Sequence, residues 1–301
     1  MMKQKLLPYI LLFPGLLLTG ACHTARLQGP APATVYPKQA VTQTKKALTP
    51  PKLSAQQLPQ TLGGLVQSDS WIIYKDKQQE EFSGNVSYDN GAYIFKADYA
   101  LSDRAKNTFS ARGHVFLRQN NPDGSFYQGQ ADRGWYNYKT QKGALFAEQN
   151  QPVRLVYHNE KGQQMTATSR KVNFDLNQKI YVLEKDVHLE QQTAQGTQTI
   201  TAQKATLKQT DEYILLEGKA TISDGKRTLL ANTFIYDKKN NVSYAYGGRP
   251  MAYGETDAGT FAVIADQLQA DAQGEILHLE GNTQGWFVSP QINNSDINKK
   301  F

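Results

Sequence analysis

The chain has 301 residues, with 33 Lys and Arg against 27 Asp and Glu and a formal net charge of +6. This mild basicity gives no argument for a nucleic-acid partner, and we predict none, whereas an anionic lipid or glycan is compatible with it. The single cysteine, Cys22, excludes a disulfide framework, so stability must come from burial and strand pairing.

Residues 1–21 predict a cleaved signal peptide. Lys3 and Lys5 provide the positive start, and a short apolar run follows that is broken by proline. The small residues Leu-Thr-Gly-Ala immediately before Cys22 resemble the lipobox of bacterial lipoproteins, and Cys22 is therefore the predicted acylated lipid anchor. An ordinary secretory signal with a coincidental cysteine is the alternative.

The residue after the cysteine bears on localisation. In the lipoproteins that this segment resembles, Asp at this position commonly retains the protein at the inner membrane. Here the residue is His23. We therefore predict a periplasmic protein that is lipid-anchored to a membrane, with the outer membrane favoured and the inner membrane left open.

A change of composition separates a tether from a folded region. Residues 22–67 are rich in Pro, Ala, Thr, Gln and Lys and show no lasting periodicity, which predicts a Pro-rich tether held by the lipid anchor. Residues 68–290 are expected to fold, as one domain or as two fused halves that meet near 155–165. A disordered tail is expected over 291–301.

A repeat runs through the folded region with a period of about 33 residues. Its anchor residues are Ala97, Ala131, Ala167, Ala202, Ala231 and Ala265. Four of them have a glycine 16 residues later, namely Gly113, Gly218, Gly247 and Gly281. In the copy that precedes Gly218, Lys185 takes the glycine position. A fixed period of this length is typical of stacked repeats that bury a shared face.

Alternating apolar residues and Gly- or Asn-containing turns predict that each repeat is a β-hairpin. The predicted fold class is all-β, with repeated antiparallel hairpins in an elongated β-jelly roll. A glycine within a strand marks a bend or bulge, so its recurrence predicts a sheet folded over into two facing walls.

Inward residues of the two walls are expected to line a continuous apolar trough. The candidates are Val115, Leu117, Phe174, Val182, Val187, Leu189, Ile200, Leu207, Leu216, Ile222, Phe234 and Ile264. For any one of them, a place in a dry core is the alternative interpretation.

Aromatic residues crowd the first half of the folded region, among them Trp71, Tyr88, Phe95 and Tyr127. They are compatible with a platform for a lipid or glycan. We favour the more common explanation, which is strand propensity and cross-strand pairing.

Catalytic motifs are not apparent in the sequence. The five histidines show no metal-ligand spacing, and neither a nucleophile elbow nor a phosphate-binding glycine loop occurs. We predict no catalytic residue, no metal and no cofactor, and a protein that is not an enzyme. A carboxylate pair for glycoside cleavage, dispersed in the sequence, is left open.

Two pairs of segments carry a family resemblance. They are Thr201–Leu207 with Leu215–Ile222, and Ile264–Leu268 with Leu279–Asn282. Their repeated Leu-Glu-Gly-containing pattern resembles the OstA-like proteins of lipopolysaccharide transport, the LptA/LptC group. The resemblance is degenerate in any one copy and gains its specificity from repetition.

The resemblance implies a boat-shaped β-jelly roll whose interior holds the acyl chains of lipopolysaccharide or a related lipid. It also implies pairing of open sheet edges with other OstA-like transport proteins. The expected function is a non-enzymatic periplasmic bridge component of lipopolysaccharide export, with Val187, Leu189, Leu216 and Ile222 favoured as acyl contacts. The alternative is a structural outer-membrane lipoprotein that binds a protein partner through exposed strand edges.

Overall fold

The computed structural model describes residues 65–289, apart from 149–150, 161, 194–195, 209–210, 212, 238, 241, 257–258 and 272–276. This part of the chain consists of strands and connecting turns, which confirms the predicted all-β class. None of its segments is a helix with the length and hydropathy to cross a membrane. The predicted signal peptide, Cys22, His23 and the tail lie outside the described residues.

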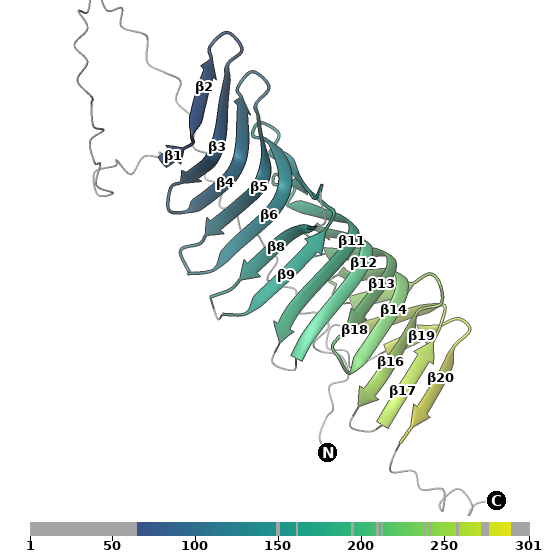
Figure 1. Cartoon of the computed structure of the whole chain (residues 1–301). Coiled ribbons are helices and arrows are strands. Elements are labelled where there is room, and N and C mark those ends of the chain that lie inside the picture. The colour runs from purple at the N-terminus through teal and green to yellow at the C-terminus, as the bar shows by residue number, and fades with distance from the viewer. Residues whose placement is uncertain are drawn as a thin grey trace, which may run out of the picture.

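Twenty strands pair in antiparallel register into a single sheet (Figure 1). The eight long strands are β3 (Gln79–Asp89), β4 (Tyr93–Asp103), β5 (Thr108–Asn120), β6 (Phe126–Asn137), β11 (Ile180–Thr193), β12 (Gly196–Lys208), β13 (Tyr213–Ser223) and β14 (Arg227–Asp237). The short strands are β1 (Leu65–Gln67), β2 (Ser70–Tyr74), β7 (Lys142–Phe146), β8 (Val153–His158), β9 (Gln164–Ser169), β10 (Lys171–Asp175), β15 (Val242–Tyr246), β16 (Met251–Thr256), β17 (Gly259–Ile264), β18 (Gln267–Asp271), β19 (Leu277–Glu280) and β20 (Gln284–Val288).

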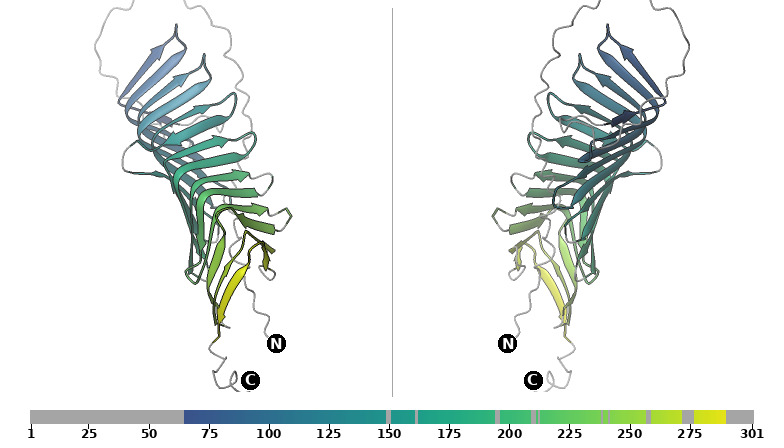
Figure 2. Two further views of the ribbon diagram at one scale, coloured as in Figure 1. Left: turned by 90° about the vertical axis from the view of Figure 1, so that its right-hand side faces the viewer. Right: turned by 90° about the vertical axis from the view of Figure 1, so that its left-hand side faces the viewer.

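The sheet is folded over into two walls, because every long strand bends near its middle. One half of each long strand lies in wall A, which also contains β2, β7, β10, β15, β18 and β19. The other half lies in wall B, which also contains β1, β8, β9, β16, β17 and β20. Figure 2 shows the two walls meeting along one side, with the strands stacked along the long axis of the molecule.

The domain prediction differs from the structure at its start. The composition places Leu65–Gln67 in the tether, but these residues form β1 and pair with Ser87–Asp89 of β3. Strands on both sides of 155–165 belong to the same sheet, through β8 and β9. The division into one domain or two stays a prediction.

The bends are built from consecutive left-handed residues. Gly113 has φ of 73° and His114 has φ of 47°, and the ladder between β4 and β5 is interrupted at the same level. Gly218 (φ 79°) and Lys219 (φ 52°) repeat this arrangement in β13. Two residues of the glycine strand lie opposite one residue of its neighbour, which is the geometry of a β-bulge. The corner role predicted for the repeated glycines is confirmed at these positions.

Lys185 lies at the equivalent corner of β11 with φ of 63°, where its neighbours in the repeat carry glycine. The residue 16 positions before it is Ser169, which is fully buried at the end of β9. Ala167, the predicted anchor, instead lies two residues earlier inside the wall. The repeat is therefore more regular than the alanine pattern indicates.

Polar side chains connect several corners to the next across 16 residues. Asp98 Oδ2 lies 2.8 Å from His114 Nδ1. Asn282 Nδ2 donates to Asp266 Oδ2 at 2.8 Å, and Asn85 Nδ2 donates to Asp69 Oδ2 at 3.0 Å. Arg170 and Asp186 form an ion pair with an N···O distance of 3.5 Å. These exposed contacts run along the line where the walls meet.

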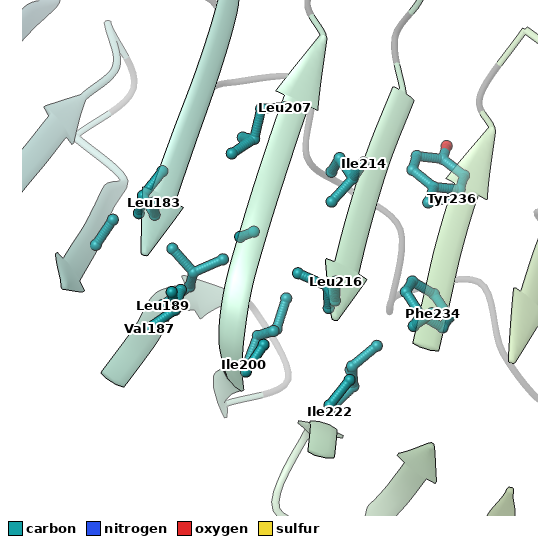
Figure 3. Packing of buried hydrophobic residues seen from close by; sticks show 14 of the residues in the cluster. Leu183, Val187, Leu189, Ile200, Leu207, Ile214, Leu216, Ile222, Phe234 and Tyr236 are labelled. Atoms are coloured by element: carbon teal, nitrogen blue, oxygen red, sulfur yellow. The ribbon is translucent and has the colours of Figure 1, made fainter. Parts of the chain in front are cut away.

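The largest apolar cluster runs from Leu145 of β7 to Leu268 of β18, and it fills the space between the walls from β11 to β14. Leu183, Leu189, Leu216 and Ile222 are each no more than 2% exposed and belong to this cluster. Figure 3 shows their side chains pointing into one common layer from neighbouring strands. The middle of the molecule is therefore closely packed.

Candidate functional site

A large apolar cavity separates the walls in the N-terminal half. Its volume is about 660 Å³, within the range of about 300–1,000 Å³ that is typical of small-molecule sites. Its apolar lining includes Val66, Phe82, Phe95, Phe109, Leu117, Leu145, Leu155, Phe174 and Tyr181. These residues come from β1, β3, β4, β5, β7, β8, β10 and β11, so the cavity, here called the trough, runs across many strands.

The floor of the trough is closed by aromatic contacts between the walls. The Phe95 ring of wall B meets the Phe109 ring of wall A edge to face, with centroids 5.1 Å apart. Tyr127 and Tyr157 stack at 4.7 Å along wall B. Edge-to-face and offset pairs stabilise by about 0.5–1.5 kcal/mol beyond area burial. The Phe95–Phe109 pair therefore joins the two walls, and all four rings line the trough.

Two glycines make room inside the trough. Gly129 lies in the inward row of wall B, between Leu117 of β5 and Leu155 of β8 in the ladder. A Cβ at Gly129 would meet the Leu155 side chain at 3.5 Å, which is ordinary contact, so the backbone would accept a larger residue. On wall A, a Cβ at Gly143 would overlap the Phe174 ring, and this glycine therefore lets that ring lie close to the strand.

The rim of the trough is mainly cationic. Arg104, Arg118 and Lys179 contribute to the lining, against the single carboxylate of Glu80. Arg104 pairs with Glu80 while its own side chain stays 68% exposed. The Arg118 guanidinium lies 3.9 Å from the centre of the Phe126 ring, and its Nε donates to Asn120 Oδ1 at 2.8 Å. An apolar interior below cations suits an amphipathic ligand with an anionic head.

The structure divides the predicted trough residues into groups. Leu117 and Phe174 line the trough. Val115 is buried at the corner beside Ala97 and Ala111. The closed cluster contains Val187, Leu189, Ile200, Leu207, Leu216, Ile222 and Phe234. The residues favoured as acyl contacts are thus in closed packing rather than at the trough.

Val182 and Ile264 lie on the outer face, in contrast to the inward orientation that the pattern predicts. Val182 is half-buried between the buried Tyr181 and Leu183, so the alternation of side chains places it on the opposite face. The corner of β11 contains two left-handed residues, Lys185 and Asp186, and the alternation continues unchanged across it, so Val187 and Leu189 are buried like Leu183. Ile264 likewise alternates with Val263, which is paired with Ala252 in the inward row.

Sequence reasoning missed most of the trough. Phe82, Phe95, Phe109, Tyr127 and Tyr157 all line it. The signal in the sequence is the aromatic crowding of the first half of the folded region, for which cross-strand pairing is the favoured explanation. Both explanations hold, because several of these rings pair and also face the cavity.

The described part of the chain contains no candidate metal site. Its His, Cys, Asp and Glu side chains form no group of three or more that could hold a metal ion. Among the described residues, the trough is the feature that points to a ligand.

The N-terminal part of the folded region is similar to known proteins. Residues 65–202 match the family LptA/(LptD N-terminal domain) LPS transport protein. Among solved structures, LptH, the LptA homologous periplasmic component of the lipopolysaccharide transport device from Pseudomonas aeruginosa, matches with 12% identity and a TM-score of 0.23. That match covers 50% of this chain and 80% of the LptH chain. A search of curated proteins found no match. The family match spans β1 to the corner of β12 and includes the whole trough, so this region of the chain is similar to the LptA/LptD N-terminal domain proteins of lipopolysaccharide transport.

Proposed function

We propose that the protein binds the acyl chains of lipopolysaccharide, or of a related lipid, in the trough as a non-enzymatic periplasmic component of lipopolysaccharide export. The observation that carries this proposal is the apolar cavity of about 660 Å³ beneath a cationic rim. Each buried methylene contributes about 0.8 kcal/mol, so even part of one acyl chain supplies useful affinity. Arg104, Arg118 and Lys179 are placed to meet phosphate groups above the chains.

Both ends of the sheet support a role as a bridge. At the N-terminal end, Trp71 is 52% and Ile73 is 56% exposed on β2, which pairs with β3. At the C-terminal end, Trp286 is 55% and Phe287 is 54% exposed on β20, which pairs with β17. Exposed apolar edge strands are suited to strand addition by another chain. We propose other OstA-like transport proteins as the partners.

The proposed location follows from the N-terminal sequence. Acylated Cys22 would anchor the tether to a membrane, and His23 favours the outer membrane. A single lipid-anchored tether would leave the folded part free to meet partners in the periplasm.

A matched pair of glycine substitutions tests lipid binding. Gly129→Leu fills the trough from wall B, whereas Gly285→Leu adds the same side chain to the same inward row far from the trough. Native mass spectrometry of the full chain with lipopolysaccharide, and separately with phospholipid, measures the adducts. We expect a stoichiometric lipopolysaccharide adduct for wild type and Gly285→Leu, and at least a tenfold loss for Gly129→Leu.

Two results would count against the proposal. An undiminished adduct with folded Gly129→Leu would show that lipid binds elsewhere. If folded wild-type protein captured neither lipid, the scaffold function that uses only the exposed strand edges would be the better explanation.

A further inference from the structure

We infer that the trough is blind: an acyl chain held in it stops at Tyr181 and has no path to the C-terminal half. This inference rests on the proposed function and adds a direction to it. Lipid would be loaded and released in the N-terminal part of the molecule, while the edge formed by β19 and β20 would serve docking alone.

The same two inward rows that line the trough are filled farther along the sheet. On wall B, the row continues from Leu155 through Ala167 to Leu189 and Ile200. On wall A, Phe174 is followed by Tyr181 and then Leu207. Tyr181 is 5%, Leu189 2% and Leu207 5% exposed, so side chains from both walls occupy the space that is open beside Gly129. The closure results from side-chain size at repeated positions.

A polar pair reinforces the closure near the rim. Gln191 of β11 and Gln198 of β12 are directly opposite each other, in the inward row that contains Tyr157 and Met165. Gln198 is 3% exposed, and Gln191 Oε1 is buried without a hydrogen-bond partner among the described residues. These two amides place polar groups in the row where a methylene chain would need apolar contacts. The apolar track therefore ends here on wall B.

Beyond the packed middle, the described residues also line a far smaller cavity. It has a volume of about 50 Å³ and lies among Leu229, Phe234, Phe261 and Leu268. The closed cluster of β11 to β14 separates it from the trough. An acyl chain could cross this barrier only if the walls moved apart and gave up that packing.

Terminally labelled lipids locate the end of the site. Fatty acids of increasing length, each with a diazirine on the last carbon, are incubated with the full chain, irradiated and mapped by peptide mass spectrometry. We expect the longest probes to label β10 and β11 around Phe174 and Tyr181, with competition by lipopolysaccharide. Labelling of β13 and β14 around Leu216 and Phe234 would overturn the blind trough and leave lipid binding intact. Absence of labelling throughout would instead overturn the proposed function.

Two core substitutions sharpen this test. Leu189→Ala removes the large side chain nearest the trough on the wall B row, and Ile222→Ala makes a comparable cavity farther along that row. We expect Leu189→Ala to move labelling onto β12 near Ile200, and Ile222→Ala to leave the pattern unchanged. If either alanine variant fails to fold, Leu189→Val and Ile222→Val make the same comparison with smaller cavities. An unchanged pattern in folded Leu189 variants would contradict the assigned barrier.

Discussion

Gln203 covers the glycine at position 218: a Cβ added to Gly218 would lie 2.7 Å from Gln203 Oε1 and 2.8 Å from Gln203 Cβ. The same relation joins Asp98 to Gly113 and Asp266 to Gly281. A polar residue on one strand thus packs over the glycine of the next strand at successive corners. Glycine recurs because both the positive φ and the close approach require it.

The first prediction separates these two requirements. Gly218→Ala would place alanine at φ of 79° and bring its methyl group against Gln203. Gly225→Ala would place alanine at φ of 85° with open space around the methyl group. A left-handed alanine costs about 1–2 kcal/mol, so both variants are expected to lose that amount. Gly218→Ala should lose about 1 kcal/mol more from overpacking. Urea unfolding measures both free energies, and equal losses would show that Gln203 moves aside freely.

The second prediction concerns Lys185, which holds a left-handed conformation at a corner. Lys185→Gly should raise the free energy of unfolding by about 0.5–1 kcal/mol. The substitution removes the backbone strain of a left-handed lysine, about 1–2 kcal/mol, and this gain exceeds the entropic cost of ordering glycine. Lys96→Gly, in the exposed extended part of β4, is the control and should lower stability by a similar amount. Thermal unfolding of both variants provides the comparison. A loss of stability in Lys185→Gly would indicate that the Lys185 side chain makes a stabilising contact.

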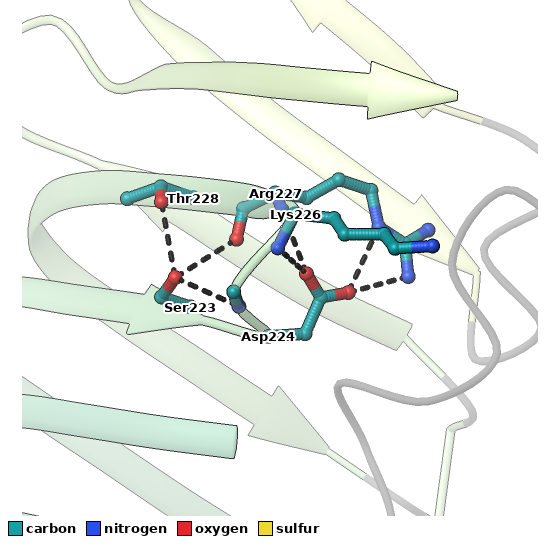
Figure 4. A network of polar contacts seen from close by, with 6 residues as sticks. Ser223, Asp224, Lys226, Arg227 and Thr228 are labelled. Carbon is teal, nitrogen blue, oxygen red and sulfur yellow. Dashed lines mark hydrogen bonds and ion pairs between the residues drawn. The ribbon is translucent and has the colours of Figure 1, made fainter. Parts of the chain in front are cut away.

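The third prediction concerns the turn between β13 and β14 (Figure 4). Asp224 Oδ1 accepts from the backbone N–H of Arg227 at 2.7 Å and of Lys226 at 3.0 Å, while Oδ2 accepts from Arg227 Nε at 2.9 Å. Burial raises the pKa of Asp224, but these hydrogen bonds and the Arg227 charge outweigh it and hold the pKa below its usual range. The folded state therefore favours the carboxylate.

The contribution of Asp224 to the free energy of unfolding depends on pH. A depressed folded pKa stabilises the protein above the unfolded value of about 3.9, and this contribution is lost as the pH falls through the folded pKa. Asp224→Asn should lower the unfolding midpoint at pH 7 and reduce the difference between pH 7 and pH 3. Thermal unfolding across this range tests the expectation. An unchanged difference would mean that other carboxylates account for the acid sensitivity; those with a lowered pKa are Asp103, Asp123, Asp175 and Asp237.

The fourth prediction concerns the open edges. Ile72 of β2 is 44% and Trp286 of β20 is 55% exposed. Because exposed apolar edge strands promote association, Ile72→Lys and Trp286→Lys should each reduce concentration-dependent assembly in sedimentation velocity. Stability should change by no more than about 0.5 kcal/mol at these surface positions. Assembly that is insensitive to both variants would exclude the edges as the contact.

The sequence carries information about corners more directly than about the trough. A left-handed corner needs glycine or a tolerated substitute, so Gly218 and even Lys185 can be recognised one residue at a time. An open trough depends on two walls that approach each other from distant segments. Gly129 lies outside the glycine repeat, and the period-2 pattern is the same whether Leu189 meets a lipid or another side chain. The inward set could therefore be assigned to the interior, but not divided into lining and core.

The difference between the predicted and the observed orientation of Val182 and Ile264 has a related cause. The corner at Gly218 and Lys219 keeps the side-chain alternation, because Leu216 and Ala220 are both buried. The corner between Ala202 and Ala205 reverses it, because these two buried residues are three positions apart. In β11 the inward series runs through Leu183 and Val187, and Val182 is excluded from it. Counting residues across a bend without knowing its type therefore assigns about half of the positions to the wrong face.

The 16-residue spacing of the corner contacts also bears on how the chain folds. Asp69 with Asn85, Asp98 with His114 and Asp266 with Asn282 each close within a single hairpin-sized segment. These corners are thus closed by local contacts, and low sequence separation favours fast folding. A chain emerging from its N-terminus could complete one corner after another, each new hairpin using the last as its template. Folding is then expected to propagate along the molecule in steps.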